Sequence, residues 1–386
     1  MSATAHRVHG VDDDSVAPDW PALEAAEVSA LLQRYPALGA LVQLHWHSPR
    51  PLSAAALVDT TAGRVFIKRH HRHVRSVASL LEEHRLMAHV RAAGVPVPQV
   101  LLDRDGCSAV ALGDGIYEIH ACAAGVDIYR EKRSWSPLET RGHAHTAGRM
   151  LATLHDAAAD YRLAGASTGA GNQRSTHLLV ARSELVTSAD WAATLQQQLA
   201  ARPGLADYLD QRRWPDDLRR LQATSEPTLA ARLGTQPALW THGDWHVSNL
   251  CWSSERTDAE VLAVLDFGLC ARTFALFDLA TAIERNAIAW LALETGMAAV
   301  HADMALALIE GYRSVRPLAA ADVTLLGQLL PFVHVDFALS EVEYFHAVLH
   351  SRAMADVAYD TFLLGHAAWF GTPPGQFLLK AISGCA

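Results

Sequence analysis

The sequence is short of the features that mark secreted, membrane and disulfide-stabilised proteins. Its longest apolar stretch, Ala287 to Val300, contains Glu294 and Gly296 and is too short to cross a bilayer. Residues 1–20 include three consecutive aspartates and no apolar run, unlike a signal peptide. The cysteines are odd in number and lack metal-type spacing; they are Cys107, Cys122, Cys251, Cys270 and Cys385. We therefore expect a cytoplasmic protein without a membrane partner.

Basic residues are also scarce. The chain has 32 Lys and Arg against 41 Asp and Glu, a formal net charge of −9. A nucleic-acid-binding protein normally has a basic patch, so we expect no nucleic-acid partner, and no obligate protein partner is evident. Hydrophobic residues make up 50% of the 386 residues and charged residues 19%. This composition is typical of a globular chain that can form two lobes with a sizeable core.

The first third of the chain is predicted to be rich in strands. Residues 1–37 are interpreted as a leader with one short helix, from Pro21 to Tyr35. From residue 38 to 121 apolar residues recur with period two, which predicts five strands and one helix. The strands are expected at 41–46, 55–59, 64–69, 108–112 and 116–120, and the helix at 74–93, ended by Gly94, Pro96 and Pro98.

The remaining chain, 122–386, is predicted to be mainly helical. We expect one long helix at 141–161 and a helical insert at 162–236. A hairpin is predicted from strands at 249–252 and 261–267, with helices again from Phe274 onward. The expected fold is therefore α+β, with a small five-stranded antiparallel β lobe carrying one helix and a larger, mainly helical lobe.

Residues 241–249 contain the densest group of polar side chains, just before a predicted strand. Asp244 and Asn249 lie here, and Asp266 ends the following strand, before a Phe-Gly dipeptide. Phosphoryl transfer needs one carboxylate that accepts or orients the hydroxyl proton, and an amide and a second carboxylate that hold Mg²⁺ against the phosphates. Each motif alone is also found in ordinary turns. Both in this order, joined by a hairpin, predict a kinase catalytic loop without its usual arginine.

Lys68 and Glu83 form a second candidate pair. Lys68 lies on the third predicted strand, and Glu83 lies within the apolar stripe of the following helix, formed by Leu80, Leu86, Met87 and Val90. A carboxylate on a buried helix face is costly unless a cation pairs with it. We therefore predict an ion pair between Lys68 and Glu83 beside the phosphates of ATP. The alternative is that Glu83 extends to solvent.

These motifs resemble those of the aminoglycoside phosphotransferase and choline kinase family of protein-kinase-like enzymes. The resemblance covers about residues 40–290. It rests on the HGDWHVSN loop at 242–249, LDFG at 265–268, FDLA at 277–280, the helix of Glu83 with its GVPVP exit at 94–98, and Leu154-His155. It implies a bilobal kinase-like fold in which 38–121 binds nucleotide and 122–386 holds the catalytic loop and the acceptor.

The resemblance also implies residue roles. Asp244 would be the catalytic base, and Asn249 and Asp266 would be the Mg²⁺ ligands. Lys68 would bind the α and β phosphates of ATP, held in place by Glu83. The remaining implied roles are bracing of the catalytic loop by His242, His246 and Asp278, and pairing with adenine by a hinge at 117–121 that includes Glu118 and His120.

One feature of kinase nucleotide sites is missing. No Gly-x-Gly-x-x-Gly precedes Lys68, and the candidate phosphate loop is His-Ser-Pro-Arg-Pro-Leu-Ser at 47–53. Backbone amides, the hydroxyl of Ser48 or Ser53, and the charge of Arg50 are the groups available to cover phosphate. The two prolines remove amides and stiffen the loop. This departure concerns the affinity and choice of nucleotide more than the chemistry.

Two further groups of polar residues have simpler interpretations. His70, His71 and His73 follow Lys68, and neighbours on an extended segment point to opposite faces, so we predict a solvated basic run rather than a metal site. Four acidic residues lie in predicted helices and are explained equally well by an acceptor pocket or by solvated helix faces: Glu284, Asp336, Glu341 and Glu343.

The sequence as a whole predicts an ATP- and Mg²⁺-dependent phosphotransferase that moves the γ-phosphoryl group to a hydroxyl of a small molecule. Suitable acceptors are an aminoglycoside-like antibiotic, an amino alcohol or a hydroxy amino acid, and the motifs do not choose among them. The alternative is a catalytically silent kinase-like protein that binds a nucleotide or small molecule. A protein kinase is disfavoured because the loop arginine and a long activation segment are missing.

Overall fold

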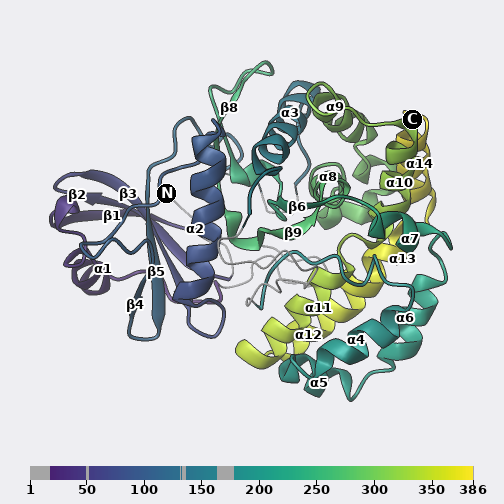
Figure 1. Cartoon of the computed structure of the whole chain (residues 1–386), viewed down its shortest axis with the longest axis horizontal. Helices are drawn as coiled ribbons and strands as arrows, with labels where there is room; N and C mark the ends of the chain where they lie inside the picture. Colours follow the sequence, from purple (N-terminus) through teal and green to yellow (C-terminus); the bar gives the residue numbers. More distant parts are fainter. Residues whose placement is uncertain (1–17, 49–51, 131, 133–135, 163–177, 386) are drawn as a thin grey trace.

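The computed structural model describes residues 18–48, 52–130, 132, 136–162 and 178–385. The chain forms two lobes, and the smaller one lies on the left in Figure 1. The smaller lobe contains α1 (Ala25–Leu32), η1 (Pro36–Leu38), β1 (Leu41–His47), β2 (Ala54–Thr60), β3 (Gly63–His71), α2 (Val77–Ala92), β4 (Val110–Leu112) and β5 (Gly115–Ala121). The five predicted strands and the predicted helix are therefore confirmed, each strand to within two residues at either end.

The small-lobe sheet has one face in the hydrophobic core and one face that lines a cavity. Its strand order is β1-β2-β3-β5-β4, and every pair is antiparallel. Because side chains alternate across a strand, Ala56, Ile67 and Ile119 lie in one buried cluster on one face. Lys68 and Glu118, which are partners in the register of β3 and β5, line a cavity on the other face. The period-two pattern thus separates the core of this lobe from its functional surface.

Residues 18–37 are part of the small lobe rather than a separate leader. Val28, Leu31 and Leu32 of α1 are buried in the same cluster as the inner face of the sheet. Trp20 stacks on His71, with ring centroids 4.5 Å apart. Burial of these apolar side chains removes them from water and gives the short α1 the tertiary support that an isolated helix of this length lacks.

The larger lobe is mainly helical, as predicted (Figure 1). The helical insert is present as α4–α7, and its residues 163–177 lie outside the described residues. The α-helices are α3 (Arg141–Ala158), α4 (Trp191–Leu199), α5 (Pro203–Leu209), α6 (Trp214–Gln222), α7 (Leu229–Gly234), α8 (Ala275–Asn286), α9 (Ala302–Arg313), α10 (Ala320–Leu329), α11 (Val335–Glu343), α12 (Arg352–Val357), α13 (His366–Trp369) and α14 (Pro373–Ser383). Shorter 3₁₀ and π segments are η2 (Val247–Asn249), η3 (Phe267–Leu269), η4 (Trp290–Ala299), η5 (Leu330–Phe332), η6 (Tyr344–Val348) and η7 (Ala358–Gly365).

Two small antiparallel sheets flank the segments that contain Asp244, Asn249 and Asp266. The predicted hairpin is present as β7 (Leu250–Trp252) paired with β8 (Val261–Val264), although β8 ends before Asp266. A second pair, β6 (Ala238–Thr241) with β9 (Ala271–Phe274), is not predicted by the sequence. Strands of four residues that pair across some thirty intervening positions leave little periodic signal in the sequence.

Helices α3 and α9 pack with their backbones in close approach. A Cβ atom added at Gly148 would lie 2.1 Å from the carbonyl oxygen of Leu308, and one at Gly311 would lie 1.9 Å from that of His145. Both distances are shorter than any real Cβ contact. Glycine at these two positions therefore permits the crossing on which the larger lobe is built.

One helical run, Ala320–Val348, has the length and apolar composition of a membrane span. In its most apolar window 78% of the residues are buried inside the protein, as in a core helix of the larger lobe.

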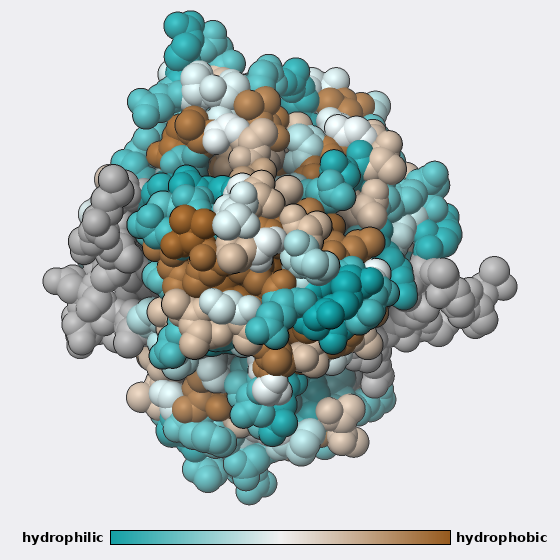
Figure 2. Space-filling view, turned by 90° about the vertical axis from the view of Figure 1, so that its left-hand side faces the viewer, coloured by the Kyte–Doolittle hydropathy of each residue, from teal (hydrophilic) through white to brown (hydrophobic). Residues whose placement is uncertain are grey.

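Apolar residues also reach the surface of the molecule. Figure 2, which faces the small-lobe end, shows a hydrophobic patch across its middle with hydrophilic residues around it. Val42 and Leu102 are 62% and 60% exposed.

Candidate active site

The loop with Asp244 begins directly after β6, in the larger lobe. Gly243 has φ +79°, in the left-handed region, and a Cβ there would lie 2.4 Å from the carbonyl oxygen of Leu269. Only glycine avoids this contact and the strain of that backbone conformation. The chain then passes Asp244, forms η2 and enters β7. The loop is thus held between the two small sheets, which fixes the position of Asp244.

Two buried side chains of α8 hydrogen-bond the backbone of this loop. The carboxylate of Asp278 accepts hydrogen bonds from the backbone amides of His242, at 2.8 Å, and Gly243, at 2.9 Å. Asn286 donates to the carbonyl oxygen of Trp245, at 2.8 Å, and accepts from the amide of Val247, at 3.1 Å. Asp278 therefore makes the contacts that loop bracing requires. Sequence reasoning misses Asn286, because a buried asparagine at a helix end has no distinctive spacing.

The two histidines of the loop also contact its backbone. His242 Nε2 hydrogen-bonds the carbonyl oxygen of Leu265, at 2.8 Å, and its Nδ1 accepts from the amide of Asp244, at 3.2 Å. His242 thus links the loop to the segment that leads to Asp266. His246 Nδ1 accepts from the amide of Ser248, at 3.3 Å, and its Nε2 lies 3.4 Å from Oδ2 of Asp244.

Asp244 is ionised at neutral pH. Burial by itself would raise its pKa, but the charges of His246 and Arg285 and the hydrogen bond from His246 outweigh burial, so the pKa lies well below its usual range. Nη1 of Arg285 lies 3.9 Å from Oδ1 of Asp244. A carboxylate held in this state can accept a hydrogen bond from a hydroxyl group.

Asn249 and Asp266 present oxygen atoms toward the same space. The amide nitrogen of Asn249 donates to the backbone oxygen of Asp244, at 2.9 Å, and to its Oδ2, at 3.2 Å. Oδ1 of Asn249 has no hydrogen-bond partner among the described residues, so it is available as a ligand atom. Asp266 has φ 54° and ψ 73°, a left-handed conformation that is uncommon outside glycine, and it accepts from the amide of Gly268, at 3.3 Å.

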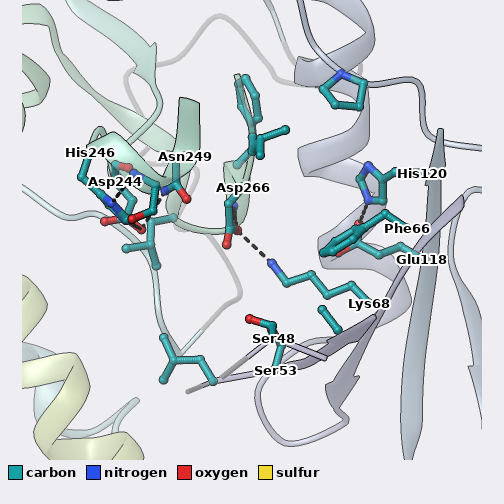
Figure 3. Close-up of a pocket in the computed structure, with 18 of the residues that line it drawn as sticks. Ser48, Ser53, Phe66, Lys68, Glu118, His120, Asp244, His246, Asn249 and Asp266 are labelled. Carbon is teal, nitrogen blue, oxygen red and sulfur yellow. Dashed lines mark hydrogen bonds and ion pairs between the residues drawn. The ribbon is translucent and has the colours of Figure 1, made fainter. Parts of the chain in front are cut away.

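Lys68 reaches Asp266 across the boundary between the lobes. Its Nζ lies 2.8 Å from Oδ1 of Asp266, and both side chains face the cavity in Figure 3. Burial would raise the pKa of Asp266, but the charge and hydrogen bond of Lys68 lower it to about 2. Asp244, Asn249, Asp266 and Lys68 therefore converge, as the sequence predicts, and both charges of the ion pair are in place for a polyphosphate and a cation.

The predicted ion pair between Lys68 and Glu83 is not formed. Glu83 is 4% exposed, and its Oε2 lies 3.4 Å from Nη1 of Arg75, which is itself 5% exposed. Glu83 is therefore buried and paired, as predicted, but with a different cation. Arg75 lies in the turn just before α2, so it reaches Glu83 locally, while Lys68 extends toward Asp266. Sequence reasoning misses Arg75, which also lines the cavity near Gly268.

The predicted hinge at 117–121 is part of the sheet. The amide of Ala121 donates to the carbonyl oxygen of Gln99, at 2.9 Å, and the carbonyl oxygen of Ile119 accepts from the amide of Leu101, at 2.7 Å. On the other edge this stretch pairs with β3. Much of this backbone is therefore already hydrogen-bonded to its neighbours. Pairing with adenine stays a prediction, and the segment that follows also lines the cavity, with Cys122, Ala123 and Gly125.

Glu118 and His120 line the cavity with their side chains rather than with a hinge backbone. His120 lies beside Phe66 on the cavity wall in Figure 3. Of the predicted phosphate loop, residues 49–51 lie outside the described residues. Ser48 and Ser53 line the cavity below Lys68 (Figure 3). Their contact with phosphate stays a prediction.

The cavity has a volume of about 610 Å³ and extends past Asp244 into the larger lobe. In that lobe it is also lined by Arg285 and Glu341 together with the apolar side chains Phe337, Phe345, Met354 and Phe362. The side chain of Glu341 makes no hydrogen bond or ion pair with any described residue. Burial, together with the charges of Asp244, Glu284 and Asp19, raises the pKa of Glu341 to about 8 although Arg285 opposes this. The sequence leaves Glu341 between pocket and solvent, and the fold places it in the pocket.

Comparison with known proteins gives the same family from the sequence. The model of the phosphotransferase enzyme family APH matches residues 52–318. The homoserine kinase of Xanthobacter autotrophicus is 26% identical over 318 residues, which cover 82% of this chain and 85% of the relative. The homoserine kinase of Methylobacterium radiotolerans is 27% identical over 260 residues, 67% of each chain.

Solved structures of the same fold agree. A microcompartment-associated aminopropanol kinase aligns with a TM-score of 0.54 and 19% identity, covering 92% of this chain and 98% of that one. The amicoumacin kinase hAmiN, in complex with AMP-PNP, Ca²⁺ and Ami, aligns with a TM-score of 0.52 and 14% identity, covering 94% and 96%. With the kinase-like bilobal fold and the family match over residues 52–318, the chain belongs to the phosphotransferase enzyme family and is a small-molecule kinase with a hydroxyl acceptor.

Proposed function

We propose that the protein transfers the γ-phosphoryl group of ATP, with Mg²⁺, to the hydroxyl of a small acceptor that carries an ammonium group, and that a hydroxy amino acid is the first candidate. One observation carries the proposal: Asp244, Asn249, Asp266 and Lys68 line the same cavity as Glu341, whose side chain has no ion-pair partner among the described residues. The phosphoryl donor and the acceptor would then meet at Asp244.

The residues present fit a magnesium ion. Oδ1 of Asn249 and the carboxylate of Asp266 are oxygen donors, the ligand type that Mg²⁺ prefers. The amide nitrogen of Asn249 is held by Asp244, so its oxygen is the atom directed away from that contact. When bound there, Mg²⁺ would neutralise charge on the phosphates as the γ-phosphoryl group leaves.

The protein groups would act by positioning and by charge. Lys68 would exchange its contact with Asp266 for the α and β phosphates, which leaves the Asp266 carboxylate to the metal. Asp244 would accept a hydrogen bond from the acceptor hydroxyl and align its oxygen with the γ-phosphorus. Because the pKa of Asp244 is held low, we expect it to take the proton late, as the new phosphate ester forms.

The acceptor end favours a cation. Glu341 is half-buried, and a partly desolvated carboxylate without a side-chain partner gains from an ammonium group, which replaces the water it has lost. The apolar residues around Glu341 would pack on the carbon skeleton of the acceptor. Arg285, which lies 3.9 Å from Asp244, would meet an acceptor carboxylate. Relatives of 26% and 27% identity that carry the name homoserine kinase support an acceptor with hydroxyl, ammonium and carboxylate groups.

The test is ADP release from Mg²⁺–ATP across three acceptor classes: L-homoserine and other hydroxy amino acids, aminopropanol and other amino alcohols, and aminoglycosides. We expect turnover with a hydroxy amino acid, and loss of at least about 100-fold in Asp244→Asn with nucleotide binding retained. The des-amino analogue of the active acceptor should be a much poorer substrate.

Four outcomes would contradict parts of the proposal. Turnover that persists in Asp244→Asn would remove Asp244 from its role. Equal turnover of the des-amino analogue would remove the ammonium requirement. Nucleotide binding without turnover of any acceptor would favour a catalytically silent binding protein, and labelled phosphate on a protein band would favour a protein kinase.

A further inference from the structure

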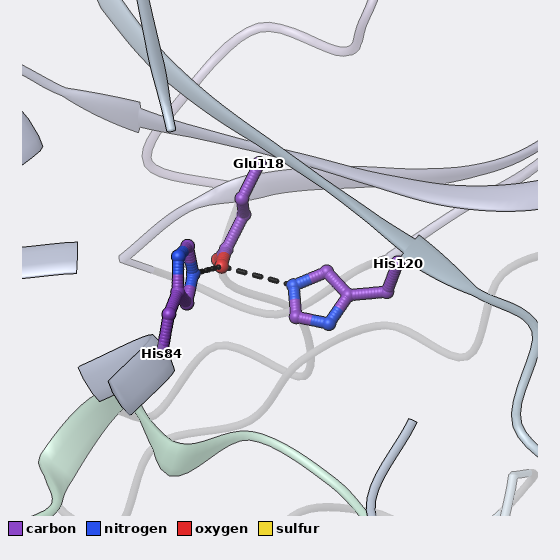
Figure 4. A group of neighbouring side chains, drawn as sticks. All are labelled: His84, Glu118 and His120. Atoms are coloured by element: carbon purple, nitrogen blue, oxygen red, sulfur yellow. Dashed lines mark hydrogen bonds and ion pairs between the residues drawn. The ribbon is translucent and has the colours of Figure 1, made fainter. Parts of the chain in front are cut away.

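Three histidines, His70, His84 and His120, surround Glu118 in the small lobe, beside the part of the cavity that Lys68 lines. Glu118 and His120 are two residues apart on β5, so their side chains leave the same face of the strand. His84 comes from α2 and points at them (Figure 4). Nε2 of His84 and Nε2 of His120 lie 2.7 Å and 2.9 Å from Oε2 of Glu118. One ligand atom from each of the three residues lies within 4.8 Å of the others.

We propose that His84, Glu118 and His120 form a binding site for Zn²⁺ or a similar first-row divalent cation, distinct from the magnesium position at Asn249 and Asp266. Two imidazole nitrogens and one carboxylate oxygen are the donor set of zinc sites that keep a fourth position for water or ligand. Mg²⁺ prefers oxygen donors alone, so imidazole ligands select against it. The proposal does not depend on the proposed function.

The surrounding residues orient the ligands in the way that metal sites require. Nδ1 of His84 hydrogen-bonds Oγ of Ser108, at 2.8 Å, which leaves Nε2 for Glu118 or a metal. The second carboxylate oxygen of Glu118, Oε1, is 2.9 Å from Nε2 of His70. A second hydrogen bond on each of these ligands fixes its orientation and raises its affinity for metal. The sequence predicts a solvated His70, but it is 3% exposed and faces this cluster.

The cluster attracts positive charge. Burial would lower the pKa of His84, but the hydrogen bond and charge of Glu118 outweigh burial and raise it. The pKa of Glu118 lies well below its usual value, because the nearby imidazoles outweigh its burial. His70, by contrast, has its pKa lowered to about 4 by burial and stays neutral. A divalent cation would replace the proton on His84 and satisfy the buried carboxylate directly.

The distances require only a small adjustment. Ligand atoms about 2.1 Å from a tetrahedral Zn²⁺ are about 3.4 Å from one another, so the contacts of His84 and His120 with Glu118, now 2.7 Å and 2.9 Å, would open by about 0.5–0.7 Å. The side chains of His84 and Glu118 are 4% and 2% exposed, while that of His120 is 13% exposed and lines the cavity. The ion would therefore enter from the cavity, and its open coordination position would face the nucleotide.

The experiment measures metal binding to the whole, unmodified chain. Equilibrium dialysis with Zn²⁺, with metal analysis of the protein, should give one ion per chain. Titration with Co²⁺ should give the intense visible absorption of a tetrahedral site, which Zn²⁺ then displaces. His84→Ala and His120→Asn should each weaken Zn²⁺ binding by more than about tenfold, while Asp266→Asn and the exposed His73→Ala should bind as the wild type does.

The Co²⁺ absorption spectrum is measured on the wild-type protein, so this part of the test does not depend on whether a variant folds. Circular dichroism checks that the variants are folded. The proposal is overturned if the wild type binds no stoichiometric Zn²⁺, which would leave the cluster as a hydrogen-bond network only. It is also overturned if bound Co²⁺ is octahedral, or if Asp266→Asn abolishes binding while His84→Ala and His120→Asn retain it. The last result would place the ion at the magnesium position.

Discussion

Single side chains at the site owe their charge to neighbours on other elements. Asp244 and Glu341 are both carboxylates of the cavity, yet the pKa of one lies far below its usual range and that of the other is raised to about 8. The difference follows from the neighbouring charges: His246 and Arg285 lie beside Asp244, while the charges of Asp244, Glu284 and Asp19 add to the burial of Glu341 and only Arg285 opposes them. One kind of charged group could thus serve the two proposed roles, alignment of a hydroxyl and capture of an ammonium group.

The raised pKa of Glu341 predicts a pH dependence. The folded protein binds one more proton than the unfolded chain between about pH 4.5 and pH 8, so this residue lowers stability as pH rises through that window. Glu341→Gln should therefore be more stable than the wild type, by a margin that grows toward pH 8. Thermal unfolding at several pH values measures the margin.

The same variant should change the pH dependence of acceptor binding. An ammonium acceptor needs Glu341 ionised, so the wild-type KM for the acceptor should fall between pH 6.5 and pH 8, the range just below the pKa of about 8. In Glu341→Gln the KM should be higher and nearly flat, with the KM for ATP unchanged. A wild-type acceptor KM that is flat across this range would speak against the ammonium contact.

Asp278 predicts a second effect at this scale. Its buried carboxylate accepts from two backbone amides of the loop and from His155, 3.1 Å away. Asp278→Asn replaces an acceptor by a donor, so it should lower the unfolding free energy by about 1.5–3 kcal/mol and lower kcat more than it raises the KM for ATP. Denaturant unfolding and steady-state kinetics test both.

The sign of the pH effect at Asp278 is opposite to that at Glu341. The pKa of Asp278 is lowered in the folded protein, because the hydrogen bond and charge of His155 outweigh burial. Its contribution to stability is present above the unfolded pKa near 3.8 and is lost as pH falls below it. The difference in unfolding free energy between the wild type and Asp278→Asn should therefore become smaller as the pH falls below about 3.8. A constant difference down to pH 3 would contradict this.

Among the elements, the crossing of α3 and α9 depends on glycine. A Cβ at Gly311 would lie 1.9 Å from a backbone oxygen that cannot move without its helix. Gly311→Ala should therefore lower the unfolding free energy by about 1–3 kcal/mol, as overpacking does. Gly234, at the end of α7, has no atom of the described residues within 4 Å of an added Cβ, so Gly234→Ala should be neutral or stabilising by up to about 1 kcal/mol. An equal decrease in unfolding free energy in both variants would show that helix packing is not the cause.

On the scale of the whole molecule, the site exists only because two lobes meet. The ion pair of Lys68 and Asp266 spans their boundary. Asp19 adds a second link, since it accepts from the amide of Leu52, at 3.0 Å, and from the hydroxyl of Tyr344, at 2.8 Å. A nucleotide bound between the lobes should therefore stabilise the entire fold.

The prediction at this scale concerns thermal stability with nucleotide. Mg²⁺–ADP at about 100 times its Kd should stabilise the wild type by about 2.7 kcal/mol. In Lys68→Met, at the same nucleotide concentration, the rise in Tm should be largely lost, and His73→Ala should keep it. An undiminished rise in Lys68→Met would place the nucleotide elsewhere.

Much of the fold and of the loop with Asp244 could be predicted, because residues close together in the sequence determine these features. Alternating residues of β2, β3 and β5 decide which face is core and which lines the cavity. Asp244 and Asn249 lie on one short loop, so their separation is fixed by the chain itself. Turn residues and helix-ending prolines likewise act within a few positions, and the predicted strand limits are accurate for that reason.

Only the tertiary structure decided which distant groups became partners. Glu83 required a cation by virtue of its burial, but Arg75 and Lys68 were both near in sequence, and packing gave it Arg75. The pairing of β6 with β9, the position of Glu341 opposite Asp244, and the meeting of His84 with Glu118 and His120 bring together residues from separate elements. The sequence by itself determined the chemistry available and the local frame. Competition among contacts across the folded chain determined the pairs, because the energy of a buried charge depends on its neighbours in space.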